Sequence, residues 1–138
     1  MLKRTMGGVV AALLVLAPAL QAQAAASAKD TVVDGRRLSE WVKDLKAQAP
    51  QVRNAAAYEI SGLGPSAAPA VPALIEALDD SDPSVRFPVT VALGEIGPSA
   101  SAAVPKLKQM MDEERNDEIA AAAKRAIRKI KPEALAGE

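Results

Sequence analysis

Acidic side chains gather at two places where they could bind a cation. Asp79, Asp80 and Asp82 lie close together, and a second acidic group follows within residues 112–118. Carboxylate oxygens are the ligands that calcium prefers. Neither group has the ligand spacing and central glycine of a calcium-binding hand, and acids at a helix start are already favoured by the helix dipole. We therefore interpret both groups as helix-start signals and expect no bound metal.

The residue types that most often perform catalysis are missing or lack partners. The chain contains no histidine and no cysteine, which excludes imidazole bases, thiol nucleophiles, disulfides and the commonest zinc ligands. Ser61, Ser66 and Ser99 lie in no nucleophile motif, and no phosphate-binding loop or dinucleotide fingerprint occurs. The sequence therefore predicts a protein that is not an enzyme and binds no cofactor.

Length and charge narrow the class of partner. The 138 residues suit a single domain, and the formal net charge is +0. Removal of Lys3 and Arg4 with the leader described next leaves a slight acidic excess. Nucleic acid is bound mainly through cationic side chains, so it is not expected as a partner.

Residues 1–24 have the pattern of a secretory signal peptide, with a basic start, an apolar run over residues 9–16 and a small-x-small cleavage site at Ala22-Gln23-Ala24. The apolar run is shorter than the ~20 residues that a membrane-spanning helix needs. We expect cleavage after Ala24, a periplasmic or secreted protein, and no membrane association after removal. Residues 25–36 are predicted to form a flexible lead-in, with order beginning near Gly35.

The stretch from residue 82 to residue 111 repeats a pattern found 33 residues earlier. Val52-Arg53 aligns with Val85-Arg86, and Gly64-Pro65-Ser66-Ala67 aligns with Gly97-Pro98-Ser99-Ala100. At an offset of 34 the C-terminal stretch joins the series, again with apolar residues at helical spacing. The alignment predicts six helices of two alternating classes, B and A: residues 38–47 (B), 50–63 (A), 68–79 (B), 83–96 (A), 102–113 (B) and 117–130 (A).

The residues that flank these helices are typical start and stop signals. Asp82 is expected to cap the first turn of its helix, with Pro83 at the first helical position, and Ser39 is the expected cap of the first helix. Gly64 and Gly97 occupy the left-handed position at which a helix ends, and each is followed by proline.

Phe87-Pro88 breaks the repeat, because the matching positions are Asn54-Ala55 and Ala121-Ala122. A proline inside a helix removes one backbone hydrogen bond, so we expect a kink or a loosened helix at Pro88. The polar and small residues that align with Phe87 predict that its ring is exposed and able to contact a partner. Tyr58 is placed on the less buried side in the same way, whereas Trp41 aligns with Leu74 and is expected in the core.

Asp-Pro-x-Val-Arg, then Gly-Pro-x-Ala and Ala-Val-Pro-x-Leu, resembles HEAT repeats of the phycobilin-lyase type over residues 37–132, leaving residues 133–138 as a tail. The resemblance implies an all-α fold, a short α-solenoid of antiparallel helix pairs. It also implies that the arginine after the valine pairs with an acid at the preceding turn, which would join Arg86 to Asp80 or Asp82. Arg53 has only alanines, Ala47 and Ala49, at the corresponding places.

In such a solenoid the B helices should line the concave side, which is the expected surface for a partner. With Phe87, the candidate partner-binding residues are Glu40, Lys43, Asp44, Glu76, Asp80, Lys106, Gln109 and Met110. A basic group near the C-terminus is interpreted as the solvated face of a terminal repeat: Lys124, Arg125, Arg128, Lys129 and Lys131.

The leading functional hypothesis is a non-catalytic protein–protein interaction scaffold or adaptor in an extracytoplasmic compartment, with a protein partner of unknown identity. The resemblance also implies a chromophore-attachment factor of the lyase type as an alternative. A HEAT-repeat iron hydroxylase does not fit, because its metal is held by histidines. A third reading is a structural subunit whose solenoid ends stack on copies of itself through weak self-association.

Overall fold

The computed structural model describes residues 30–137. The predicted signal peptide and most of the lead-in lie outside these described residues. The unit that begins at Thr31 is described here by itself. Its elements are β1 (Val32–Val33), β2 (Arg36–Arg37), α2 (Leu38–Asp44), α3 (Pro50–Gly62), the 3-10 helix η1 (Gly64–Ala70), α4 (Val71–Ala77), α5 (Pro83–Ile96), the 3-10 helix η2 (Gly97–Ala103), α6 (Val104–Glu113), α7 (Asp117–Ile130) and the 3-10 helix η3 (Pro132–Leu135).

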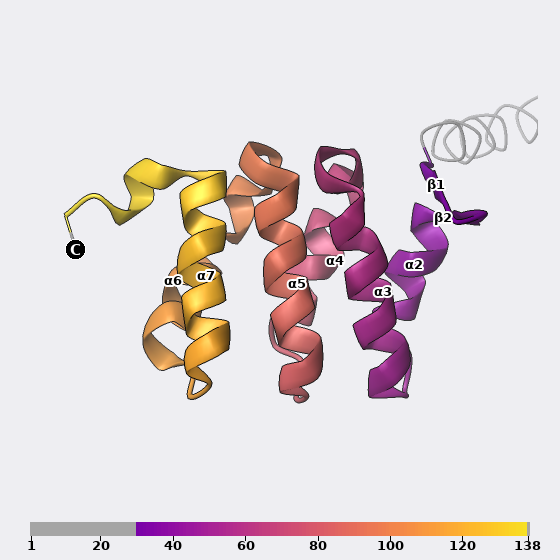
Figure 1. Cartoon of the computed structure of the whole chain (residues 1–138), viewed down its shortest axis with the longest axis horizontal. Helices are drawn as coiled ribbons and strands as arrows, with labels where there is room; N and C mark the ends of the chain where they lie inside the picture. The colour runs from indigo at the N-terminus through magenta and orange to yellow at the C-terminus, as the bar shows by residue number, and fades with distance from the viewer. Residues whose placement is uncertain (1–29, 138) are drawn as a thin grey trace, which may run out of the picture. The chain divides into compact units, whose positions relative to one another are not determined.

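The helices form two layers, as the alternating pattern predicts. Figure 1 shows α3, α5 and α7 side by side in one layer, with α2, α4 and α6 behind them. Within the A layer α5 packs against both α3 and α7, and each B helix packs on the A helix that follows it. The structure confirms an all-α fold, a short α-solenoid of antiparallel helix pairs.

The A helices have nearly the predicted bounds, whereas the B helices are shorter than predicted. The helices expected from residues 68 and 102 begin at Val71 and Val104, because each is preceded by a seven-residue 3-10 helix. Gly64 has φ 55° and Gly97 has φ 79°, which confirms the left-handed stop signals. The first helix ends at Asp44 and begins at Leu38 with Arg37 as its cap, not Ser39.

A small hairpin lies where the sequence indicated a flexible lead-in. Val32 pairs with Arg37 and Val33 with Arg36 in an antiparallel ladder. The two turn residues have positive φ, 47° at Asp34 and 77° at Gly35, as the two-residue turns of hairpins require. The backbone N–H of Leu38 donates to the carbonyl of Thr31 at 2.7 Å, so the hairpin is tied to the start of α2.

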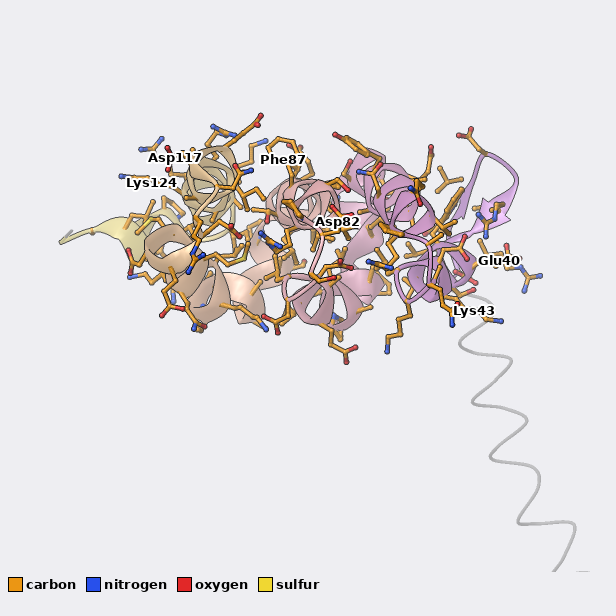
Figure 2. The ribbon with its side chains drawn as sticks, turned by 90° about the horizontal axis from the view of Figure 1, so that it is seen from below. Glu40, Lys43, Asp82, Phe87, Asp117 and Lys124 are labelled. Atoms are coloured by element: carbon orange, nitrogen blue, oxygen red, sulfur yellow. The ribbon has the colours of Figure 1, made fainter. Side chains whose placement is uncertain are left out.

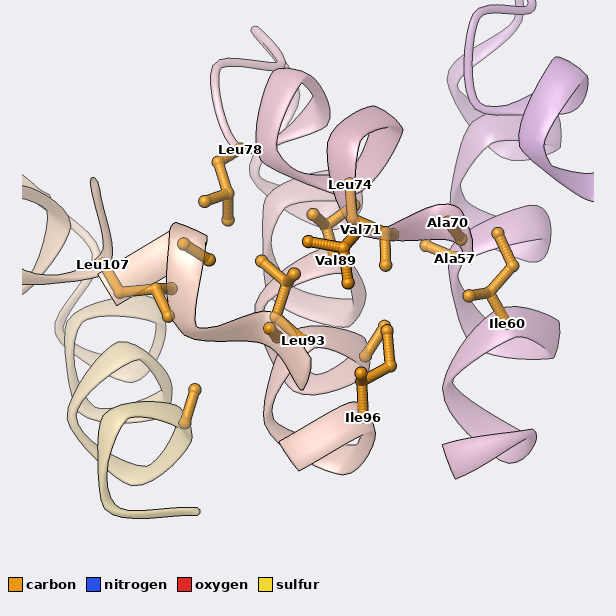
Figure 3. Close-up of a cluster of buried hydrophobic side chains, with 14 of the residues drawn as sticks. Ala57, Ile60, Ala70, Val71, Leu74, Leu78, Val89, Leu93, Ile96 and Leu107 are labelled. Atoms are coloured by element: carbon orange, nitrogen blue, oxygen red, sulfur yellow. The ribbon is translucent and has the colours of Figure 1, made fainter. Parts of the chain in front are cut away.

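The core is a continuous row of aliphatic side chains between the two layers. Figure 3 shows Leu74, Val89 and Leu93 gathered between α4 and α5, with Ile60 of α3 on one side and Leu107 of α6 on the other. These side chains are fully buried or nearly so. Small residues let the A helices approach closely: a Cβ added to Gly94 would lie 3.1 Å from Cα of Ala126.

Two further expectations change in the structure. The kink or loosening expected at Pro88 does not interrupt α5, which runs as one helix from Pro83 to Ile96 with Pro88 inside it. The C-terminal tail is partly ordered, because η3 continues the chain after α7, and Ala134 and Leu135 pack half-buried against the core. Trp41 also lies against the core but is only half-buried.

Candidate functional site

Each arginine of the repeat joins two consecutive turns, because it donates both to the turn before its helix and to an acid of the next turn. Arg53 of α3 donates from Nε and Nη2 to the two carboxylate oxygens of Asp80, at 2.6 and 2.9 Å. Its Nη1 donates to the carbonyls of Ala47 and Gln48, both at 2.8 Å. This two-pronged arrangement matches the planar fork of a guanidinium to a carboxylate.

The next repeat forms the same arrangement. Arg86 donates from Nε and Nη2 to Glu114, at 2.8 and 3.0 Å, and from Nη1 to the carbonyls of Asp80 and Ser81, at 2.9 and 3.3 Å. Here the sequence prediction was wrong. The acid comes from the following turn, because the preceding turn offers its carbonyls to Nη1, and Arg53 therefore has an acidic partner after all.

We call the Arg53–Asp80 and Arg86–Glu114 pairs the arginine ladder. Hydrogen bonds favour the charged form of both of its acids. Asp80 also accepts the backbone N–H of Asp82 at 2.9 Å, and Glu114 accepts that of Asn116 at 3.2 Å. The hydrogen bond from Arg53 lowers the pKa of Asp80, and the hydrogen bond from Arg86 lowers the pKa of Glu114. Both oxygens of each carboxylate are thus engaged by the fold, and residues 30–137 contain no group of three acids arranged to hold a metal ion.

Asp82 caps the N-terminus of α5, as predicted. Its carboxylate accepts the N–H of Ser84 at 2.9 Å. The pKa of Asp82 is lowered mainly by a hydrogen bond from the side chain of Ser84, and further by this backbone hydrogen bond. Asn116 has the same role at α7, where its side chain accepts from Glu118 and Ile119 at 3.0 and 3.2 Å. The interpretation as a helix-start signal is therefore confirmed for Asp82, whereas Asp80 and Glu114 instead hold the arginines.

The B helices carry two neighbouring hollows between them. One, of about 230 Å³, lies between α2 and α4 and is lined in part by Leu45, Glu76 and Asp80. The other, of about 420 Å³, lies between α4 and α6 and contains four of the predicted contact residues, namely Asp80, Lys106, Gln109 and Met110. We call the surface that holds both hollows the B-helix face.

Several predicted contact residues are already engaged within the chain. Glu40 accepts the backbone N–H of Arg37 at 2.9 Å, Asp44 pairs with Arg36 at 2.9 Å, and Glu76 pairs with Lys46 at 3.0 Å. Lys106 pairs with Asp79, and Gln109 donates to Glu113 at 2.9 Å. Glu76, Gln109 and Lys43 remain exposed. Figure 2 shows Glu40 and Lys43 at the α2 end of the array and Asp117 and Lys124 at the α7 end.

Two predicted contact residues are less accessible than expected. Met110 is only 9% exposed, because it turns toward the core from α6. Phe87 is half-buried and packs against the core rather than standing free. The alignment of Phe87 with Asn54 and Ala121 did not reveal this packing.

Among the remaining aromatic and basic residues, some are exposed as predicted and others make a contact that was not predicted. Tyr58 is 51% exposed, as expected, and the five basic residues of the C-terminal group are all exposed. The guanidinium of Arg36 lies 3.9 Å from the centre of the Trp41 ring, a cation–π contact that sequence reasoning missed. The adjacent Asp-Gly hairpin signal was the clue that could have placed Arg36 beside α2.

The sequence model of HEAT repeats matches residues 38–128. The chain belongs to the HEAT-repeat family. No curated protein matches it. Among residues 30–137, no helix is both long and apolar enough to cross a bilayer.

Proposed function

We propose that this HEAT-repeat chain is a non-catalytic scaffold that binds another protein through its B-helix face, in the periplasm or outside the cell. HEAT repeats commonly serve as interaction scaffolds, because stacked helix pairs create an extended surface without a deep active site. The observation that carries the proposal is the pair of hollows between α2, α4 and α6.

The hollows of the B-helix face are lined by both apolar and polar side chains. Leu45 and Glu76 line the hollow between α2 and α4, and Leu78 and Gln109 line the hollow between α4 and α6. Glu76 and Gln109 are exposed. The arginine ladder fixes the spacing of the turns below. A preorganised surface of this kind lowers the entropic cost of binding.

Catalysis has little support from the titrating groups. The acids with shifted pKa values, Asp80, Asp82 and Glu114, are all shifted downward and held by structural hydrogen bonds. A general acid or base works best with a pKa near the operating pH, so these carboxylates are poorly placed for proton transfer.

The extracytoplasmic location is supported by the N-terminal pattern alone. The test is the mass of the protein recovered from periplasmic and extracellular fractions of the producing cell. We expect a chain that begins at Ala25. Recovery of the chain in the cytoplasm with Met1 retained would contradict this part of the proposal.

The binding surface is tested by capture from the same fractions, using as bait variants in which a side-chain charge is reversed or introduced. Glu76→Lys, Lys43→Glu and Gln109→Glu change exposed side chains without touching the arginine ladder. We expect these variants to lose one specific partner that the natural chain enriches. The matched control is Arg125→Glu on α7; loss of the partner with this variant alone would move the site to the A layer.

The two other readings have weaker support. Lyase-type chromophore attachment is favoured by no particular side chain on the B-helix face; a covalent adduct after incubation with bilin and apoprotein would revive it. Stacking of copies end to end is opposed by α7, whose Lys124 and Arg128 occupy the repeat positions of Thr90 and Gly94. Those two residues of α5 are buried, so the exchange places charges where close packing is needed.

A further inference from the structure

The N-terminal end of the A layer exposes apolar residues that the later repeats bury. Val52 of α3 is 40% exposed, whereas the aligned Val85 and Ile119 are 0% and 2% exposed. Ala55 is exposed, and the residues aligned with it, Pro88 and Ala122, are buried. The difference arises because α5 and α7 each have an A helix in front of them, and within residues 30–137 α3 has none.

Exposed large apolar side chains are confined to this end of the described chain. They are Val32, Val52 and Tyr58, from the hairpin and from α3. The opposite end is closed differently, since α7 presents Lys124 and Arg128 to solvent. Terminal repeats normally carry a polar outer face, so an apolar outer face at one end only indicates an interaction surface.

A charge marks the middle of this surface. Glu59 is half-buried and occupies the repeat position of Ala92 and Ala126, which are buried apolar contacts between A helices. Ala126 meets Gly94 of the helix in front, where an added Cβ would lie 3.1 Å away. By the same register, a helix in front of α3 would place one side chain directly opposite Glu59. None of the ion pairs within residues 30–137 involves Glu59.

We propose that Val52, Ala55 and Glu59 form a docking face for an α-helix of another protein, which packs on α3 as α3 packs on α5. The helix would present small or aliphatic side chains to Val52 and Ala55 and a lysine or arginine to Glu59. The apolar contacts supply affinity, and the single half-buried charge of Glu59 selects the partner and fixes its register. This surface is separate from the B-helix face and extends the proposed function to a second contact.

The probe for this face is a synthetic helix with the sequence of α3 itself, changed at one position. It consists of residues 50–63 with Ser61→Lys, because Ser61 is the repeat equivalent of Gly94 and so would face Glu59. A side-chain staple away from positions 54, 57 and 61 keeps the peptide helical, since short isolated helices are marginal in water. Binding to the full chain is measured by fluorescence anisotropy, with folding of each variant checked by circular dichroism.

We expect saturable binding that is weakened about tenfold or more by Ala55→Asp or by Glu59→Lys in the full chain. Ala121→Asp is the matched control, because it makes the same change at an exposed alanine of α7 and should leave the affinity unchanged. A second peptide with Ser61→Glu should bind the Glu59→Lys variant better than it binds the natural chain.

Two results would overturn the proposal. The first is equal affinity of the lysine peptide for the natural chain and both face variants. The second is concentration-dependent self-association in sedimentation that disappears with Lys124→Glu, which would assign the face to α7 of a second copy.

Discussion

The side-chain amide of Asn54 donates a hydrogen bond of 2.5 Å to the backbone carbonyl of Ser84. That carbonyl would normally accept the N–H of residue 88, which proline lacks. Asn54 therefore replaces from α3 the donor that Pro88 removes from α5. The break in the repeat at Phe87-Pro88 is compensated one repeat earlier, and α5 stays a single helix.

This relationship predicts a coupling that a double-mutant cycle can measure. Asn54→Ala should lower the free energy of unfolding by about 1 kcal/mol, the usual net value of one hydrogen bond. In a Pro88→Ala background the helix supplies its own donor, so the same change should cost much less. Urea denaturation of the four proteins measures both costs, and equal costs would show that Asn54 does not act through Ser84.

The arginine ladder should contribute more to stability than the exposed ion pairs do. Arg86→Ala leaves the carboxylate of Glu114, whose side chain is 10% exposed, without its cation, so we expect a loss of about 2 kcal/mol. Lys46→Ala is the control, because the Lys46 and Glu76 side chains are 68% and 67% exposed, and it should change stability by less than about 0.5 kcal/mol. Thermal or urea unfolding compares the two; similar small effects would count against the ladder.

The ladder also predicts loss of stability in acid. The pKa values of Asp80 and Glu114 lie below their ordinary values of 3.8 and 4.5, so the folded chain binds fewer protons than the unfolded chain. The stabilisation is complete above the ordinary values and is lost as the pH falls through the lower, folded-state values. Stability measured by denaturation at decreasing pH should fall in that window, and Arg86→Met should flatten the fall, whereas Lys46→Ala should not.

Close packing of α5 on α7 depends on the missing side chain of Gly94. Gly94→Val should destabilise the chain by about 2 kcal/mol, because the new side chain meets the backbone of Ala126. Gly62 lies in α3 with open space around it, so Gly62→Ala should instead raise stability by up to about 1 kcal/mol through helix propensity. In a thermal melting experiment we expect Gly94→Val to lower the melting temperature and Gly62→Ala to raise it. An unchanged melting temperature for Gly94→Val would contradict the close contact.

Local signals predicted the local parts of this fold. The Asp82 cap, the Gly64 and Gly97 stops and the order of the helices all follow from short stretches of chain. The direction of the arginine ladder did not, since Arg53 and Asp80 are 27 positions apart and their meeting depends on how the turns stack. The exposure of the candidate contact residues was predicted least well. Met110 and Phe87 are buried or half-buried, and this depends on how the neighbouring helices pack.

The ladder has a definite beginning and end, because Ala47 and Ala120 occupy the acidic and arginine positions at its two limits. The central unit supplies both an acid, Asp80, and an arginine, Arg86, to the ladder. The first unit supplies only an arginine, and the last unit supplies only an acid. Duplication of an internal unit would therefore add a complete rung and lengthen the B-helix face without altering either end. Addition of a unit at the α7 end would bury Lys124 and Arg128. The array can therefore be lengthened by duplication of an internal unit, whereas addition of a unit at the α7 end is opposed by the burial of these two charges.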